Sequence, residues 1–156
     1  MEHNIETTTN GDLTESTEST DDSLDYNNII TETFDDLNIK PNLLRGIYGS
    51  GYETPSAIQK KAIKPLIDGR DLIAQAQSGT GKTATFSIGL LERIDDTQNV
   101  TQAVVLAHTR ELALQIEGVI KNLSTYMNIE VNLSVGGTMV RDNIDALLKN
   151  PHIVIG

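Results

Sequence analysis

Residues 71–83 read DLIAQAQSGTGKT, and this stretch decides the fold that we expect. Its first part, DLIAQ, is a short apolar run that suits a buried strand. A glycine loop follows, and from about Lys82 the chain is predicted to form a helix with four apolar residues on one face: Phe86, Leu90, Leu91 and Ile94. A strand, a glycine loop and a helix in this order indicate an α/β unit.

The loop has the residue types that a phosphate cradle needs. Successive backbone N–H groups converge on the anion, so glycine is needed where a Cβ would block the approach or where φ must be positive. The pattern G-x-x-x-x-G-K-[ST] is met at every position except the first, where alanine stands: Ala76, Gln77, Ser78, Gly79, Thr80, Gly81, Lys82 and Thr83. Lys82 is expected to reach the β- and γ-phosphates, and Thr83 to place its hydroxyl on Mg²⁺. A flexible turn between strand and helix is the plainer alternative.

Strands and helices continue to alternate after this unit. Strands are predicted at residues 102–107, 129–135 and 152–155, with helices at about 112–123 and 140–149 between them. This order implies right-handed crossovers and a parallel sheet with helices on both faces.

Two helices are predicted before the glycine loop. The first follows Lys40, with Asn42 as a cap and Gly49 or Gly51 beyond its end. The second is expected to start after Thr54 as N-cap, with Pro55 at its first position, and to run toward Pro65. Asp68 and Gly69 then form a turn.

Charge and composition set limits on function. Residues 1–28 hold eight acidic side chains and no Lys or Arg, so the net charge of −10 leaves −2 for residues 29–156. Residues 1–28 are predicted to be a disordered, acidic, Ser/Thr-rich tail. The near-neutral remainder argues against nucleic-acid binding through a broad basic field, although local contacts remain open. The absence of cysteine excludes disulfides and thiolate chemistry. No apolar run approaches a membrane span, so we expect an intracellular, soluble protein without membrane contact.

Together with its flanks, the loop resembles one family. Residues 33–156 resemble the amino-terminal RecA-like domain of DEAD-box ATP-dependent RNA helicases, closest to the branch of eukaryotic translation initiation factor 4A and its nuclear paralogue in the exon-junction complex. AQSGTGKT is that family's version of the phosphate loop, which accounts for Ala76. The resemblance implies an α/β, RecA-like P-loop domain over residues 29–156 that uses ATP and Mg²⁺.

Upstream of the loop, GYETPSAIQ at residues 51–59 matches the family's Q motif, which includes Tyr52. The resemblance implies that Gln59 reads the adenine edge, since an amide offers a donor beside an acceptor. Phe34 stands where the family keeps an aromatic residue that stacks on the base. The alternatives are an exposed helical glutamine and a phenylalanine that only fills the core.

Downstream, HTRELA at residues 108–113 corresponds to the family's PTRELA motif, and SVGGT carries its paired glycines. The resemblance implies that Thr109, Arg110, Gly136 and Gly137 contact the RNA backbone. His108 replaces the family's proline, which implies a looser loop or an altered grip on RNA. A helix start capped by Thr109 and a simple glycine turn are the plainer alternatives.

Several family motifs do not occur in these 156 residues. They are T-P-G-R, D-E-A-D, S-A-T and the second RecA-like domain. We therefore expect an amino-terminal fragment that binds ATP and RNA but does not hydrolyse ATP, and in which the strand at 71–75 has an unpaired edge that promotes aggregation.

Three interpretations of function remain open. The first is part of an RNA helicase of translation initiation, cytoplasmic or alternatively nuclear, with initiation scaffold proteins as candidate partners. The second is a non-catalytic decoy module that binds nucleotide, RNA or a partner. The third is an unrelated P-loop kinase or GTPase.

Overall fold

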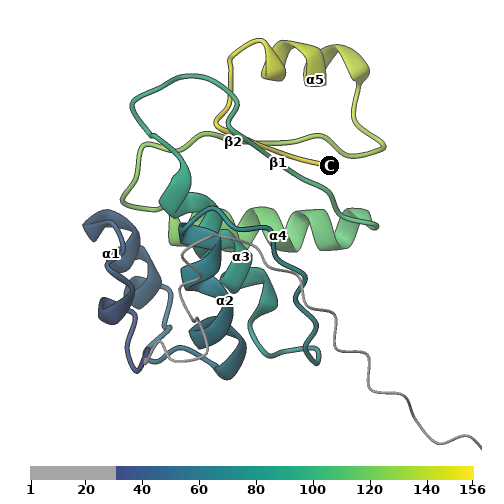
Figure 1. Cartoon of the computed structure of the whole chain (residues 1–156). Helices are drawn as coiled ribbons and strands as arrows, with labels where there is room; N and C mark the ends of the chain where they lie inside the picture. The colour runs from purple at the N-terminus through teal and green to yellow at the C-terminus, as the bar shows by residue number, and fades with distance from the viewer. Residues whose placement is uncertain (1–30) are drawn as a thin grey trace, which may run out of the picture.

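The computed structural model describes residues 31–156 (Figure 1). The tail predicted at residues 1–28 lies outside the described residues. The elements follow one another as η1 (Asp35–Leu37), α1 (Pro41–Gly49), α2 (Ala57–Ile67), α3 (Lys82–Arg93), β1 (Ala103–Val105), α4 (Arg110–Leu123), β2 (Val131–Leu133), α5 (Val140–Leu147) and β3 (Ile153–Ile155). No helix among residues 31–156 is long and apolar enough to cross a membrane.

The described strands form one parallel sheet in the order β1-β3-β2. The central strand β3 is the most buried, with Ile153 and Ile155 fully covered. The expected parallel α/β architecture is therefore confirmed, and each of these strands lies within its predicted range.

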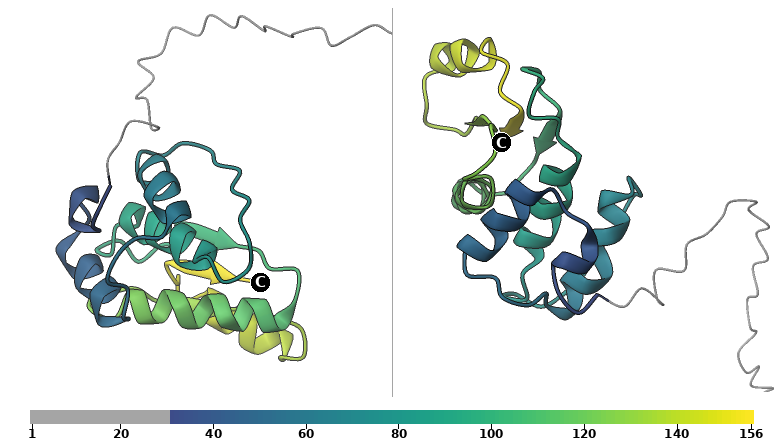
Figure 2. Two further views of the ribbon diagram at one scale, coloured as in Figure 1. Left: turned by 90° about the horizontal axis from the view of Figure 1, so that it is seen from below. Right: turned by 90° about the vertical axis from the view of Figure 1, so that its left-hand side faces the viewer.

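Helices lie on both sides of the sheet. Figures 1 and 2 show α4 on one side of β2 and β3 and α5 on the other. Helix α4 buries Ile116, Ile120 and Leu123 in the core, whereas α5 buries none of its residues. Helix α3 packs between α2 and α4, so the core lies between these helices and the α4 side of the sheet.

The helix starts before the glycine loop differ from those predicted. Helix α1 has Lys40 as its N-cap and Pro41 in its first turn, so the prediction of Asn42 as cap was wrong. The N-cap of helix α2 is Ser56, two residues after the predicted Thr54. Ser56 takes this role because it forms a capping box with Gln59. Pro65 lies inside the last turn of α2 and has no N–H to donate to the Lys61 carbonyl four residues earlier.

The predicted strand at residues 71–75 was wrong. Residues 70–77 form neither strand nor helix, and the Ile73 side chain is fully exposed. A strand needs a neighbour that accepts and donates backbone hydrogen bonds, and no described strand pairs with this segment. The edge strands of the described sheet are β1 and β2.

Candidate functional site

The glycine loop has the backbone conformations expected of an anion cradle. Gly79 has φ +80° and Gly81 has φ +94°, which L side chains rarely adopt. A Cβ added to Gly79 would meet no atom within 4 Å, so the space beside this residue is open. The loop leads directly into α3, whose first N–H groups and positive dipole end lie at the same place.

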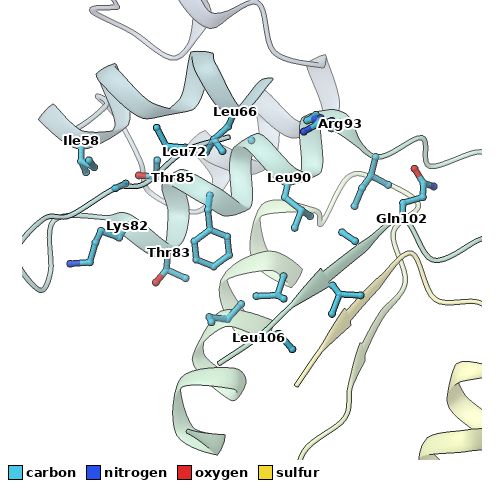
Figure 3. A pocket seen from close by; sticks show the side chains of 18 of the residues that line it. Ile58, Leu66, Leu72, Lys82, Thr83, Thr85, Leu90, Arg93, Gln102 and Leu106 are labelled. Atoms are coloured by element: carbon cyan, nitrogen blue, oxygen red, sulfur yellow. The ribbon is translucent and has the colours of Figure 1, made fainter. Parts of the chain in front are cut away.

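Lys82, the first residue of α3, folds back over the loop. Its ammonium group donates hydrogen bonds to the backbone carbonyls of Ala76 and Gln77, the latter at 2.6 Å. Neutral carbonyls are weaker partners for an ammonium group than phosphate oxygens. Thr83 projects beside Lys82 from the first turn of α3 (Figure 3).

The start of α2 is fastened to the glycine loop. The Ser56 hydroxyl donates to the Thr80 carbonyl at 2.9 Å. Gln59 is almost fully buried, and its amide oxygen accepts from the Ser56 N–H at 2.8 Å. A Cβ added to Gly81 would lie 2.8 Å from Gln59 Nε2, so the amide nitrogen of Gln59 points at the loop.

Sequence reasoning did not single out Ser56 as a site residue. The spacing S-x-x-Q from Ser56 to Gln59 is a recognisable capping-box signal that could have located the helix start. Its additional bond to Thr80 depends on tertiary packing, which that local signal does not describe.

The two aromatic residues expected near a base both pack against the core. Phe34 is fully buried in the core and meets Tyr48 edge-on, with ring centroids 6.2 Å apart. A hydrogen bond to Asp35 raises the pKa of the Tyr48 hydroxyl. Tyr52 is half-buried against the same core. A role for Phe34 or Tyr52 at a base stays a prediction.

A second group of predicted residues comes together at the start of α4. Thr109 is the N-cap, and its hydroxyl accepts from the Leu112 N–H at 3.2 Å. The Arg110 guanidinium donates to the Gly136 carbonyl at 3.3 Å. Gly137 has φ +90°, and a Cβ there would lie 3.0 Å from Arg110 Nη1.

This second group offers an exposed cation beside glycine backbone. His108, Thr109, Arg110, Gly136 and Gly137 are all exposed. The arrangement brings one guanidinium, one hydroxyl and the backbone of two glycines to one surface. Residues 31–156 contain no group of three or more His, Cys, Asp or Glu side chains that could hold a metal ion by themselves.

An open cleft of about 920 Å³ lies beside the glycine loop (Figure 3). Lys82, Thr83, Phe86 and Leu90 line it from α3, and the whole of β1 lines it from the sheet. Most of its wall is apolar. The cleft therefore extends from the candidate phosphate site to edge strand β1 of the sheet.

Comparisons with known proteins agree with this geometry. The family model for the DEAD/DEAH box helicase matches residues 56–156. The chain is 57% identical over 131 residues to the ATP-dependent RNA helicase eIF4A of Debaryomyces hansenii and 55% identical over 131 residues to that of Schizosaccharomyces pombe. Each alignment covers 84% of this chain and 33% of the relative, so the chain spans about a third of their length.

Solved structures show the same similarity. A DEAD box protein from the hyperthermophile Methanococcus jannaschii matches with a TM-score of 0.75 at 36% identity, over 80% of this chain and 34% of that one. Dbp5 of S. cerevisiae, bound to RNA and ADP BeF3, matches with a TM-score of 0.68 at 34% identity, over 81% of this chain and 32% of that one.

Proposed function

Because the chain belongs to the DEAD/DEAH box helicase family, we propose that it is the ATP-binding portion of an ATP-dependent RNA helicase. The observation that carries the proposal is the glycine loop, with positive φ at Gly79 and Gly81 and with Lys82 opening α3 beside it. The eIF4A relatives favour a role in translation initiation in the cytoplasm, with RNA and initiation scaffold proteins as partners.

In this proposal the loop encloses the terminal phosphates of ATP. The Lys82 ammonium exchanges the two loop carbonyls for phosphate oxygens, a stronger charge-assisted contact. Ser56 holds the loop through Thr80, and Gln59 presents its amide to the adenine edge. Phe34 and Tyr52 are proposed to border the base.

The loop also fits a magnesium nucleotide. The Thr83 hydroxyl makes no hydrogen bond among the described residues and lies on the cleft beside Lys82, so it is available as an oxygen ligand. Mg²⁺ is usually held by few protein oxygens together with phosphate oxygens and water, so one hydroxyl suits it. The Thr83 hydroxyl would hold Mg²⁺ there, and the ion would supply neutralisation of phosphate charge.

The exposed group at the start of α4 is proposed to hold RNA. Arg110 and Thr109 suit phosphate oxygens, and Gly136 and Gly137 let backbone groups approach the strand. Contacts of this kind give little preference for base sequence.

Hydrolysis needs more than these contacts. A metal ion, an oriented water molecule and stabilisation of the transition-state charge must meet at one place. The 156 residues supply phosphate and base contacts from this set, and no D-E-A-D or S-A-T motif occurs among them.

Nucleotide selectivity tests the proposal. In a titration with fluorescent ATP, unlabelled ATP should displace the probe at least tenfold better than GTP, because adenine and guanine present opposite donor and acceptor patterns to Gln59. Gln59→Glu keeps the oxygen that caps Ser56 but loses the amide donor, so it should narrow this preference. Equal displacement by GTP from the unsubstituted chain would contradict adenine recognition and favour a GTPase.

A further inference from the structure

Gln59 uses its amide oxygen inside the protein and leaves its amide nitrogen free. The side chain is almost fully buried, and Oε1 accepts the backbone N–H of Ser56 at 2.8 Å. This bond is one half of the capping box at the start of α2. The amide nitrogen has no partner among residues 31–156. It faces the glycine loop, because a Cβ on Gly81 would lie 2.8 Å from Nε2.

The bond from Ser56 fixes which way the Gln59 amide faces. Turning an amide by about 180° exchanges the positions of its oxygen and its nitrogen. The reversed amide of Gln59 would place an NH₂ group against the Ser56 N–H, so that two donors would face each other. A backbone N–H that loses its acceptor in this way is unfavourable. The Ser56 N–H therefore holds Oε1 toward Ser56 and Nε2 toward the loop.

The orientation of an amide decides which base it fits. Adenine offers an amino group beside a ring nitrogen that accepts, whereas guanine presents the reverse order. An amide oxygen has two lone pairs, so Oε1 can keep the Ser56 N–H and still accept from an amino group, while Nε2 donates. An amide that turned over freely would match either base, whereas an amide fixed in one orientation matches one of them.

We propose that the backbone N–H of Ser56 makes the site selective for adenine, because it keeps the Gln59 amide from turning over. Ser56 is then a positioning residue that acts on the base through Gln59. The inference rests on the proposed ATP site, and it assigns the two polar groups of Ser56 to different parts of the nucleotide. The hydroxyl, bonded to the Thr80 carbonyl at 2.9 Å, acts on the phosphate loop, and the N–H acts on the base.

Two substitutions at Ser56 separate these effects. Ser56→Ala removes the hydroxyl and keeps the N–H, whereas Ser56→Pro removes both. Proline fits the backbone at this position, where φ is −67°. Competition of unlabelled ATP and GTP against fluorescent ATP gives the ratio of the two affinities for each variant of the 156-residue chain. Ser56→Ala should weaken both nucleotides by the same factor, whereas Ser56→Pro should also lower the ratio at least about threefold, the scale of one hydrogen bond.

Two results of the competition would overturn the inference. One is an ATP-to-GTP ratio that Ser56→Pro leaves at the value of the unsubstituted chain. The other is a ratio that Ser56→Ala lowers as much as Ser56→Pro does, since the hydroxyl would then account for the selectivity. If the unsubstituted chain itself does not prefer ATP, adenine recognition fails, and this inference fails with it.

Hydrogen exchange answers the same question without a substitution, and it decides if urea denaturation shows that Ser56→Pro is unfolded. Measured by NMR, the Ser56 amide should exchange slowly with solvent both in the free chain and in the chain saturated with ATP, because Gln59 Oε1 keeps its bond in both states. Fast exchange of this amide in either state would overturn the inference.

Discussion

Gly81 combines a left-handed backbone with close packing at a single residue. Its φ is +94°, and a Cβ would meet the Gln59 amide at 2.8 Å. An L side chain in this conformation costs roughly 1–2 kcal/mol. We therefore expect Gly81→Ala to lower the free energy of unfolding by about that amount, measured by urea denaturation.

Gly118 provides the control for Gly81. It lies in the middle of α4, and a Cβ there meets nothing within 4 Å. Gly118→Ala should raise the free energy of unfolding by roughly 0.5–1 kcal/mol, because alanine loses less backbone entropy in a helix. Equal effects of the two substitutions would show that the loop conformation of Gly81 is not maintained in solution.

Arg110 allows a separate prediction about RNA. Arg110→Ala should weaken binding about equally for RNAs of different sequence, because the lost contact is to a phosphate. For the same reason, the slope of the logarithm of the RNA binding constant against the logarithm of the salt concentration should fall in magnitude by about one. Binding measured by fluorescence anisotropy at several salt concentrations checks this. Arg141→Ala, at an exposed position of α5, should leave the slope unchanged. Losses confined to one RNA sequence would contradict a backbone contact.

Local signals predicted the glycine-loop conformation and the start of α3 better than they predicted the N-caps of α1 and α2. The positive φ values of Gly79 and Gly81 and the helix start at Lys82 follow from a few adjacent residues. Thr54 resembled a cap because Pro55 follows it, yet Ser56 forms the capping box with Gln59. The bond from Ser56 to Thr80 joins residues 24 positions apart and has no local signal.

At the scale of elements, α1 and α4 cross at Gly46. A Cβ on Gly46 would lie 1.8 Å from the Leu123 carbonyl oxygen, which is backbone and cannot rotate away. We expect Gly46→Ala to lower the free energy of unfolding by about 2 kcal/mol, because the helices must separate.

Gly49 in the same helix is the matched control for Gly46. A Cβ there would make an ordinary 3.6 Å contact with the Tyr126 ring. Urea denaturation of both variants measures this difference. Gly49→Ala should change the free energy of unfolding by less than about 0.5 kcal/mol. A harmless Gly46→Ala would mean that α1 does not pack on α4 as described.

The strand expected at residues 71–75 shows where sequence patterns fail. DLIAQ has the apolar character of a buried strand, and the pattern describes only the segment itself. Pairing depends on a neighbouring strand, and the described sheet ends at β1. The three strands that do form each have a described partner, and for these the sequence prediction was confirmed.

For the molecule as a whole, stability should be concentrated on one side of the sheet. Ile120 of α4 is fully buried, whereas α5 buries nothing and Ile144 is half-exposed. Ile120→Ala should lower the free energy of unfolding by about 2–5 kcal/mol, and Ile144→Ala by less than about 0.5 kcal/mol. A large cost at Ile144 would show that α5 packs more closely than described.

The alternation of strands and helices predicted the architecture of the whole molecule. The order of elements along the chain has the glycine loop before α3, Thr109 and Arg110 at the start of α4, and Gly136 and Gly137 between β2 and α5. The position of α5 away from the core was not predicted, because its apolar residues Val140, Ile144 and Leu147 have the spacing of a buried face. Amphipathic spacing shows which face is apolar but not whether anything covers it.

The central claim is that the loop before α3 binds the phosphates of ATP through Lys82. The most direct measurement compares the ATP affinity of the 156-residue chain with that of its Lys82→Ala variant, by calorimetry at fixed Mg²⁺. The control is Lys61→Ala, which changes an exposed lysine of α2. We predict that Lys82→Ala lowers the ATP affinity roughly ten- to hundredfold, because hydrogen bonds to a charged group contribute about that much to binding. Lys61→Ala should leave the affinity unchanged. Equal ATP affinity in a folded Lys82→Ala chain would contradict the account.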